Sequence, residues 1–268
     1  MKKFITKHKK ILILISIIIA VVLLLTTTAV TGFKIMPFLN PTADNIKTCS
    51  IPTGEVVSKG IDVSRYQGEI DFNQVKSEGY DFVIIRVGTS QGGKDANFDT
   101  YYQNAVNAGL DIGCYYYTYA TTKKETRQEA KDVLTYIKGK TFTYPVFYDF
   151  EYPELLSTYR ATENTEMINT FCTVIKRGGY YPGVYLSNSA YENHVNYEEI
   201  GKTWDVWVAH YIDNTPNSKD YSKSFSMWQY SCEGSVPGIS TAVDLNVCYV
   251  DYPSIIDEFN KSYLELAN

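Results

Sequence analysis

The sequence predicts an α/β protein whose main part is a (β/α) barrel. Short apolar runs alternate with helix-like stretches through residues 57–268, roughly seven or eight times. The apolar runs are nearly continuous, which is typical of parallel strands covered on both faces. An open doubly wound sheet is the alternative, and it is weaker because GIDVSRYQGEID carries no glycine-rich phosphate loop. About 210 residues is short for a barrel, so we expect some helices to be missing.

Each strand is predicted from its own apolar run. In order, these are GIDVS (60–64), FVIIRVG (82–88), GLDIGCYYYTYA (109–120), YPVFYDFE (144–151), YPGVYLS (181–187), WDVWVAHY (204–211) and FSMWQYS (225–231). The stretches between them have the composition of helices, at 71–79, 97–108, 122–138, 163–178 and 189–200, and a last one spans 252–266. The pattern predicts strand and helix in regular alternation.

The N-terminus carries a separate export segment. Residues 1–10 hold five lysines and no acid, and residues 11–33 are apolar over a length that can cross a membrane. This order predicts a cytoplasmic tail and a single-pass signal anchor in the cell membrane, with the rest of the chain extracellular. Cleavage as a signal peptide, which would make the protein secreted, stays open because Thr27-Thr28-Ala29 is a poor cleavage site. Residues 34–56 are polar and are predicted to be a linker.

Charge excludes two classes of partner. The chain has 25 basic and 30 acidic residues; five lysines lie in the first ten positions, so the exported part has 25 − 5 = 20 basic against 30 acidic, a net charge of −10. Nucleic acid and an anionic membrane surface both need a basic footprint. We therefore expect no nucleic-acid partner and no membrane contact beyond residues 11–33.

Cysteine and histidine predict no cofactor and no metal. There is no C-x-x-C and no H-E-x-x-H, and beyond residue 8 the only histidines are His194 and His210. Cys114 and Cys172 lie in apolar segments and are expected in the core. Cys232 and Cys248 flank a Pro-Gly turn, and whether they pair stays open.

Four acids lie at matching positions in three separate units. Asp62 is near the end of the first strand, Asp149 and Glu151 end the fourth, and Asp244 lies in VDLNV. Functional groups in a barrel gather at the carboxyl ends of the strands. Alternation along a strand turns Asp149 and Glu151 to the same face, about 6.6 Å apart. Their repulsion of about 2–3 kcal/mol, or about two pKa units, predicts that one holds a proton near neutral pH. A solvated acidic edge or a cation site is the alternative interpretation.

Aromatic side chains accompany these acids and are suited to sugar rings, whose C–H faces lie against aromatic faces. We predict that substrate is bound by Tyr117, Tyr185, Trp207, Tyr211 and Trp228. The alternative for any one of them is that it fills the barrel or packs under a helix.

Several of these segments, in this order, resemble glycoside hydrolase family 25, the lysozymes of the 1,4-β-N-acetylmuramidase type. The segments, which span most of residues 59–250, are GIDVSRYQGEIDF, FVIIRVG, YPVFYDFE, YYPGVYLS, WVAHY and WQYSCEGSVPGISTAVDLNV. The resemblance implies a flattened, incomplete (β/α) barrel that hydrolyses the bond between N-acetylmuramic acid and N-acetylglucosamine in peptidoglycan.

The resemblance also implies roles. Glu151 matches the general acid, Asp149 its neighbour that stabilises a substrate-assisted or covalent intermediate, and Asp62 and Asp244 the further acids of the cleft. Retaining and inverting outcomes stay open. Tyr117 and His210 stand where the family more often has other residues. We expect a monomeric catalytic domain. A non-catalytic wall-binding module and a hydrolase of chitin-like chains are the alternatives.

Overall fold

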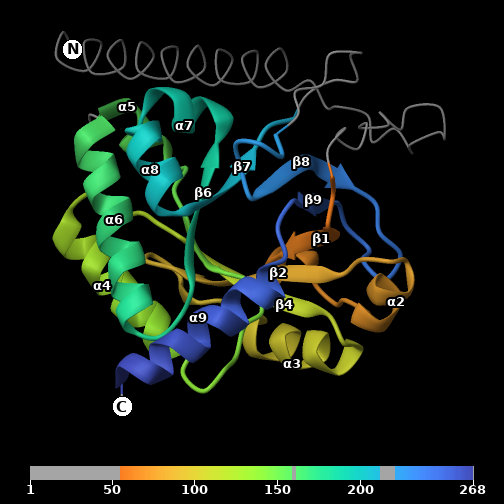
Figure 1. Ribbon diagram of the computed structural model, residues 1–268. Helices are drawn as coiled ribbons and strands as arrows, with labels where there is room; N and C mark the ends of the chain where they lie inside the picture. Colours follow the sequence, from red (N-terminus) through yellow and green to blue (C-terminus); the bar gives the residue numbers. More distant parts are fainter. Residues whose placement is uncertain (1–54, 159–160, 212–220, 268) are drawn as a thin grey trace, which may run out of the picture. The chain divides into compact units, whose positions relative to one another are not determined.

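In the described part of the chain, eight strands close into a barrel, and a short ninth strand pairs antiparallel with the end of one of them. Figure 1 shows the helices packed around these strands. The computed structural model describes residues 55–158, 161–211 and 221–267. Within these ranges the strands are β1 (Ser58–Val63), β2 (Phe82–Thr89), β3 (Gly93–Lys94), β4 (Asp111–Tyr117), β5 (Val146–Asp149), β6 (Pro182–Ser187), β7 (Asp205–Ala209), β8 (Met227–Gly234) and β9 (Val243–Cys248). The order round the barrel is β1-β2-β4-β5-β6-β7-β8-β9, with β9 returning to β1, while β3 pairs with the end of β2. The predicted barrel is confirmed.

The connecting helices follow the predicted positions closely. They are η2 (Arg65–Gln67), α2 (Phe72–Ser77), α3 (Phe98–Ala108), α4 (Lys123–Tyr136), α5 (Pro153–Thr158), α6 (Ala161–Arg177), α7 (Asn188–Asn193), α8 (Tyr197–Thr203) and α9 (Tyr252–Ala267). Of these, η2 and α5 were not predicted. The prediction of one helix over 189–200 was wrong. The chain leaves α7 at His194 and begins α8 after Asn196, whose side chain accepts a hydrogen bond from the backbone N of Glu199. Two short helices result.

The last strand, β9, was not among the predicted strands, and it breaks the parallel pattern. Among the strands of the barrel, every pairing from β1 through β8 is parallel, but β9 runs antiparallel to both β8 and β1. Residues 235–242 join β8 to β9 without a helix. A parallel return needs a crossover of about a dozen residues or more, so this connection is too short for one. The missing helix at this edge agrees with the expectation from the short chain.

The inside of the barrel is filled by large apolar side chains. Residues from the strand starts pack there with two residues of α9, in a cluster that contains Phe82, Ile84, Tyr144, Phe147, Trp207, Met227, Cys248, Tyr252 and Ile256. The rings of Tyr144 and Tyr252 lie 5.1 Å apart between centroids, so α9 closes the amino end of the barrel. Gly60 and Gly183 leave room here, because a Cβ at either position would collide with the ring of Phe82 or Phe147.

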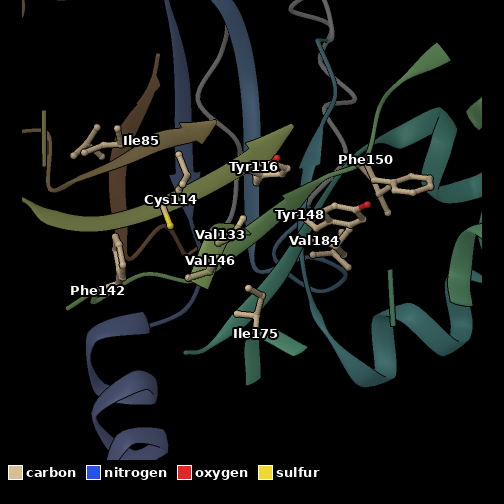
Figure 2. Packing of buried hydrophobic residues seen from close by; sticks show 14 of the residues in the cluster. Ile85, Cys114, Tyr116, Val133, Phe142, Val146, Tyr148, Phe150, Ile175 and Val184 are labelled. Carbon is tan, nitrogen blue, oxygen red and sulfur yellow. The ribbon is translucent and has the colours of Figure 1, made fainter. Parts of the chain in front are cut away.

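The outer face of the strands packs against the helices. Figure 2 shows Tyr148, Phe150 and Val184 on this side, together with Val133 of α4 and Ile175 of α6. Tyr148 stacks on Phe171 of α6 at a centroid distance of 4.1 Å. Cys114 and Cys172 are fully buried, as predicted. This layer fixes the direction in which β5 presents its other side chains.

The predicted tail, anchor and linker at residues 1–10, 11–33 and 34–56 lie almost wholly outside the described residues, which begin at residue 55. Within the described part of the chain, none of the helices combines the length and the apolar character that crossing a bilayer requires.

Candidate active site

The four predicted acids meet at the carboxyl ends of the strands. Asp62 lies on β1, Asp149 ends β5 and Glu151 follows it, and Asp244 lies on β9. They share a pocket of about 230 Å³, whose lining residues are Asp62, Tyr115, Asp149, Glu151, Tyr185, Trp207, Tyr211, Gln229 and Asp244. This is the end at which barrel proteins carry their functional groups.

The two acids of the YPVFYDFE segment lie on the same side because of strand alternation. Phe147 packs inside the barrel against Trp207, with ring centroids 5.1 Å apart, whereas Tyr148 and Phe150 pack in the outer layer. Asp149 is therefore turned inward, and both Asp149 and Glu151 line the pocket.

Asp62 is held in place by two buried amides. Its Oδ2 accepts hydrogen bonds from Gln229 Nε2 and from Asn246 Nδ2, each at 2.8 Å. Asp62 also lies directly opposite Asp244 in the antiparallel register of β1 and β9. Only 4% of Asp62 is exposed, so these donors replace the water that a carboxylate would otherwise bind.

The amides are fixed in turn by aromatic side chains. Tyr185 and Tyr211 donate their hydroxyl hydrogens to Gln229 Oε1, at 2.8 and 2.6 Å, and Trp207 Nε1 donates to Asn246 Oδ1 at 2.9 Å. Each amide thus has its oxygen occupied by an aromatic donor, which turns its NH₂ group toward the acid.

Burial is the main cause of the electrostatics of the site. It raises the pKa of Asp149 well above its usual range, and the charge of Glu151 raises it further. Burial also raises the pKa of Glu151, with the charge of Asp244 as the second cause and a hydrogen bond with Tyr185 as an offset. The pKa of Asp62 is raised well above its usual range by burial and then by Asp244, and burial raises the pKa of Asp244. The pocket therefore favours bound protons at a pH where exposed carboxyl groups are ionised.

Arg86 on β2 is the cation that acts on this group. Its charge lowers the pKa of Asp149, against the other causes. The guanidinium forms an ion pair with the buried Asp95, at 2.7 Å from its NH2 group and 2.8 Å from Nε. Nothing in the sequence distinguished Arg86 from other arginines.

The predicted aromatic residues divide into three groups. Tyr185, Trp207 and Tyr211 line the pocket. Tyr117 lies at the end of β4 and lines a neighbouring cavity. Trp228 is buried in the outer layer, 2% exposed, and its Nε1 donates to the carbonyl of His210 at 2.9 Å. Of the predicted residues, Trp228 is thus the one that the structure places away from both cavities.

Gln229, Asn246 and Tyr115 were not among the predicted site residues. All three belong to segments that the sequence had already marked, and alternation from Asp244 would have turned Asn246 to the same face. Over the described ranges, no cluster of His, Cys, Asp and Glu has the arrangement of a metal site.

Cys232 and Cys248 form no disulfide. Ser231 lies opposite Leu245 and Met227 lies opposite Cys248, so Cys232 is about four residues, or roughly 13 Å, along the ladder from Cys248. A disulfide needs Cα atoms within about 7 Å.

A barrel with paired carboxyl groups of raised pKa at its carboxyl end defines the class of hydrolases that work by acid–base catalysis on a polar substrate. The comparison with known families is consistent with this class. The model described as "Glycosyl hydrolases family 25" matches residues 61–239, which are 179 of the 268 residues. The chain belongs to this family.

Individual relatives agree. The chain is 31% identical over 188 residues to the autolytic lysozyme of Clostridium acetobutylicum, covering 70% of this chain and 55% of the relative. It is 31% identical over 194 residues to a probable GH family 25 lysozyme of Dictyostelium discoideum, covering 70% of this chain and 89% of the relative. The chain therefore spans only about half of the clostridial relative's length.

Solved structures share the fold. The bacterial lysozyme of Streptomyces coelicolor aligns with a TM-score of 0.63 and 26% identity, over 78% of this chain and 99% of that one. The modular autolysin LytC of Streptococcus pneumoniae, in complex with a synthetic peptidoglycan ligand, aligns with a TM-score of 0.61 and 26% identity, over 72% of this chain and 46% of that one.

Proposed function

We propose that the protein is a muramidase that hydrolyses the β-1,4 bond between N-acetylmuramic acid and N-acetylglucosamine in bacterial peptidoglycan. The observation that carries the proposal is the pair Asp149 and Glu151, adjacent on one strand end, both with a raised pKa, in a pocket lined by two further acids. Family membership and the lysozymes among the relatives support the same substrate.

Glu151 is the proton donor in this mechanism. Its raised pKa favours the protonated form that a proton donor needs, and this proton passes to the glycosidic oxygen as the bond to the anomeric carbon breaks. The carboxylate that remains then takes a proton from the water that completes hydrolysis. Glu151 is half-buried, so both the glycosidic oxygen and the water can reach it.

Asp149 stabilises the charge that develops on the sugar. Its Oδ1 is buried and has no hydrogen-bond partner among the described residues. The acetamido N–H of a muramic acid residue can supply the missing donor, and this contact turns the acetamido oxygen toward the anomeric carbon, where it can attack. Asp149 then faces the positively charged intermediate, and that positive charge favours the ionised form of Asp149 against the burial that raises its pKa. The expected outcome is retention of configuration.

Asp62 and Asp244 complete the negative lining, and the aromatic side chains supply faces for the sugar. Trp207 forms the floor and is fixed by its bond to Asn246. Tyr211 is half exposed at the rim, where it can contact a sugar while its hydroxyl bonds Gln229. A polar, hydrogen-bonding lining with few aromatic faces suits a carbohydrate better than an apolar ligand.

Incubation of the full chain with purified peptidoglycan tests the proposal. We expect new reducing ends at muramic acid, identified by mass spectrometry, and a loss of about 10²–10⁴-fold in kcat for Glu151→Gln. Glu154→Gln, an exposed change three residues away, is the matched control and should keep activity. No release by the wild type between pH 4 and 8, or release only from N-acetylglucosamine oligomers, would overturn the assignment. Wall binding without release would indicate a non-catalytic module.

We also propose that residues 11–33 hold the enzyme as a monomer at the outer face of the cell membrane. The support is the lysine-rich start and the apolar run that follows it. Membrane fractionation with N-terminal sequencing of the mature protein separates the anchor from a cleaved signal peptide. A soluble product that starts near residue 30 would contradict the anchor, and light scattering tests the monomer.

A further inference from the structure

A second cavity lies beside the catalytic pocket at the mouth of the barrel. Its volume is about 440 Å³, and the residues that give it its chemistry are Arg65, Tyr66, Arg86, Asp95, Tyr117 and Tyr119. The proposed mechanism uses none of them.

The two cavities are neighbours through β4. Tyr117 pairs with Thr89 of β2 on one side and with Asp149 of β5 on the other. The charges of Glu151 and then Asp149 add to burial in raising the pKa of Tyr117, which places its phenol close to the catalytic pair. β4 therefore lies between β2, which lines the second cavity, and β5, which carries Asp149, and these two strands are about 10 Å apart.

The second cavity carries a surplus of positive charge, in contrast to the four acids next to it. The Arg86 guanidinium is matched by Asp95, whose side chain is 2% exposed. Asp95 Oδ2 also accepts a hydrogen bond from the backbone N of Arg65 at 3.3 Å. The Arg65 guanidinium is exposed, and within the described ranges no carboxylate lies in ion-pair distance of it. The cavity therefore has one carboxylate, Asp95, and two guanidinium groups, those of Arg65 and Arg86.

The segment that presents Arg65 is fixed. Ser64 and Gln67 cap η2 reciprocally: Gln67 Oε1 accepts from the Ser64 backbone N at 2.8 Å, and Ser64 Oγ accepts from the Tyr66 backbone N at 3.4 Å. Arg65 and Arg86 both lie near the ring of Tyr66, with Cζ 5.2 and 4.8 Å from its centroid. The Tyr66 ring therefore holds two guanidinium groups at the rim of one cavity.

A guanidinium beside aromatic rings is a site for a carboxylate on a partly apolar group. The catalytic pocket offers an anion no such partner, because its lining holds four acids and no lysine or arginine. The glycan that the catalytic pocket is proposed to bind carries such an anion on its muramic acid, at the end of the 3-O-lactyl group or along the peptide attached to it. That substituent reaches about 10 Å from the sugar ring with the first one or two amino acids.

We propose that this cavity is a second subsite, which binds a carboxylate carried by the lactyl or peptide substituent of muramic acid and makes the enzyme prefer strands that bear this charge. Arg65 is the residue that pairs with it, and Tyr66, Tyr117 and Tyr119 lie against the apolar part of the substituent. The inference rests on the proposed muramidase activity, and it adds a basis for distinguishing muramic acid strands from neutral N-acetylglucosamine strands.

The test compares Arg65→Gln with wild type on three forms of one glycan preparation. The first keeps its peptides, the second has had them removed by an amidase so that the lactyl carboxylate is free, and the third is the second with that carboxylate converted to a neutral amide. Arg177→Gln is the matched control, because Arg177 is also exposed but ends α6 at the opposite end of the barrel.

We expect Arg65→Gln to raise KM about tenfold on at least one charged form, with kcat changed less than about twofold, and to leave the neutral amide form unaffected. The effect should shrink in about 1 M salt, since the guanidinium is exposed. Loss confined to the peptide-free strand assigns the lactyl carboxylate, and loss confined to the peptide-bearing strand assigns the peptide. Both support the subsite.

An equal effect on all three forms, or none on any, or the same effect from Arg177→Gln, overturns the subsite while leaving the muramidase intact. Wild type that releases nothing from any form overturns the muramidase assignment itself, so the two failures are distinguishable.

Discussion

Replacing Asn246 by aspartate tests the amide network that holds Asp62. Asn246 is fully buried; its Nδ2 donates to Asp62 Oδ2 at 2.8 Å, and its Oδ1 accepts from Trp207 Nε1 at 2.9 Å. Aspartate has nearly the same shape, so packing is kept. An ionised carboxylate cannot donate, however, and the bond to Asp62 becomes a contact between two carboxylate oxygens.

Two estimates of the cost converge. Unit charges about 4 Å apart repel by about 4 kcal/mol at an effective dielectric of about 20. The two carboxyl groups can instead share a bound proton. Binding it costs about 1.4 kcal/mol of free energy for each pH unit above an ordinary carboxyl pKa of about 3.9. This cost is about 4 kcal/mol at pH 7 and about 1.5 kcal/mol at pH 5. The pKa of the new carboxyl is raised in the folded state, so its penalty grows as the pH rises above the unfolded value.

Urea unfolding followed by tryptophan fluorescence at pH 5, 6 and 7 measures this cost. We expect Asn246→Asp to lower the free energy of unfolding by about 4 kcal/mol at pH 7, with the loss shrinking by about 1.4 kcal/mol per pH unit toward pH 5. Asn104→Asp, the same change on the exposed face of α3, should stay within about 0.5 kcal/mol. A loss for Asn246→Asp that is the same at all three pH values would refute the reasoning.

Three further outcomes are expected. Burial raises the pKa of Glu151, so in a profile from pH 4 to 8 kcat/KM should fall at a pH above the usual carboxyl range. A fall centred near pH 4.3 would contradict this. Asp62 and Asp149 also have raised pKa values, so the folded protein binds more protons than the unfolded chain. Tm should therefore be higher at pH 5 than at pH 8, and an unchanged Tm would contradict the raised pKa values. Glu129 on α4 is buried and accepts from the Tyr148 hydroxyl at 2.8 Å, from Thr118 and from two backbone amides. In urea unfolding, Glu129→Leu should lower the free energy of unfolding by about 3 kcal/mol and Glu129→Gln by about 1 kcal/mol. Equal losses for the two variants would contradict this expectation.

Strand alternation made part of the site predictable from sequence. In YPVFYDFE every second residue faces the same way, and the segment is long enough for the inward and outward sets to be distinguished. Phe147 and Asp149 do turn into the barrel, while Tyr148 turns to the helices. The pair of acids could therefore be placed without coordinates.

Register between strands could not be predicted, and this explains what was missed. Gln229 of β8 lies opposite Ala209 of β7, so Gln229 faces inward and its neighbour Trp228 faces outward. Sequence alone identified WQY as important but not which of its residues pointed to the pocket. Neutral amides such as Gln229 also carry no signature of chemistry, because their effect comes only from the acid that they contact.

The last strand was missed for a similar reason. VDLNV is short and mixes polar with apolar residues, since β9 pairs with β1 and β8 and places Asp244 and Asn246 in the site. Such a run has neither the continuous apolar character of a buried parallel strand nor strict alternation.

Closure of the barrel by β9 also determines when, during synthesis of the chain, the site forms. Asp62 reaches Gln229 and Asn246 across separations of 167 and 184 residues along the chain. A nascent polypeptide that lacks β9 therefore has neither a closed barrel nor an oriented Asp62, and it exposes two unpaired sheet edges. The group of four acids is therefore assembled in a single step, once residues 243–248 can pair.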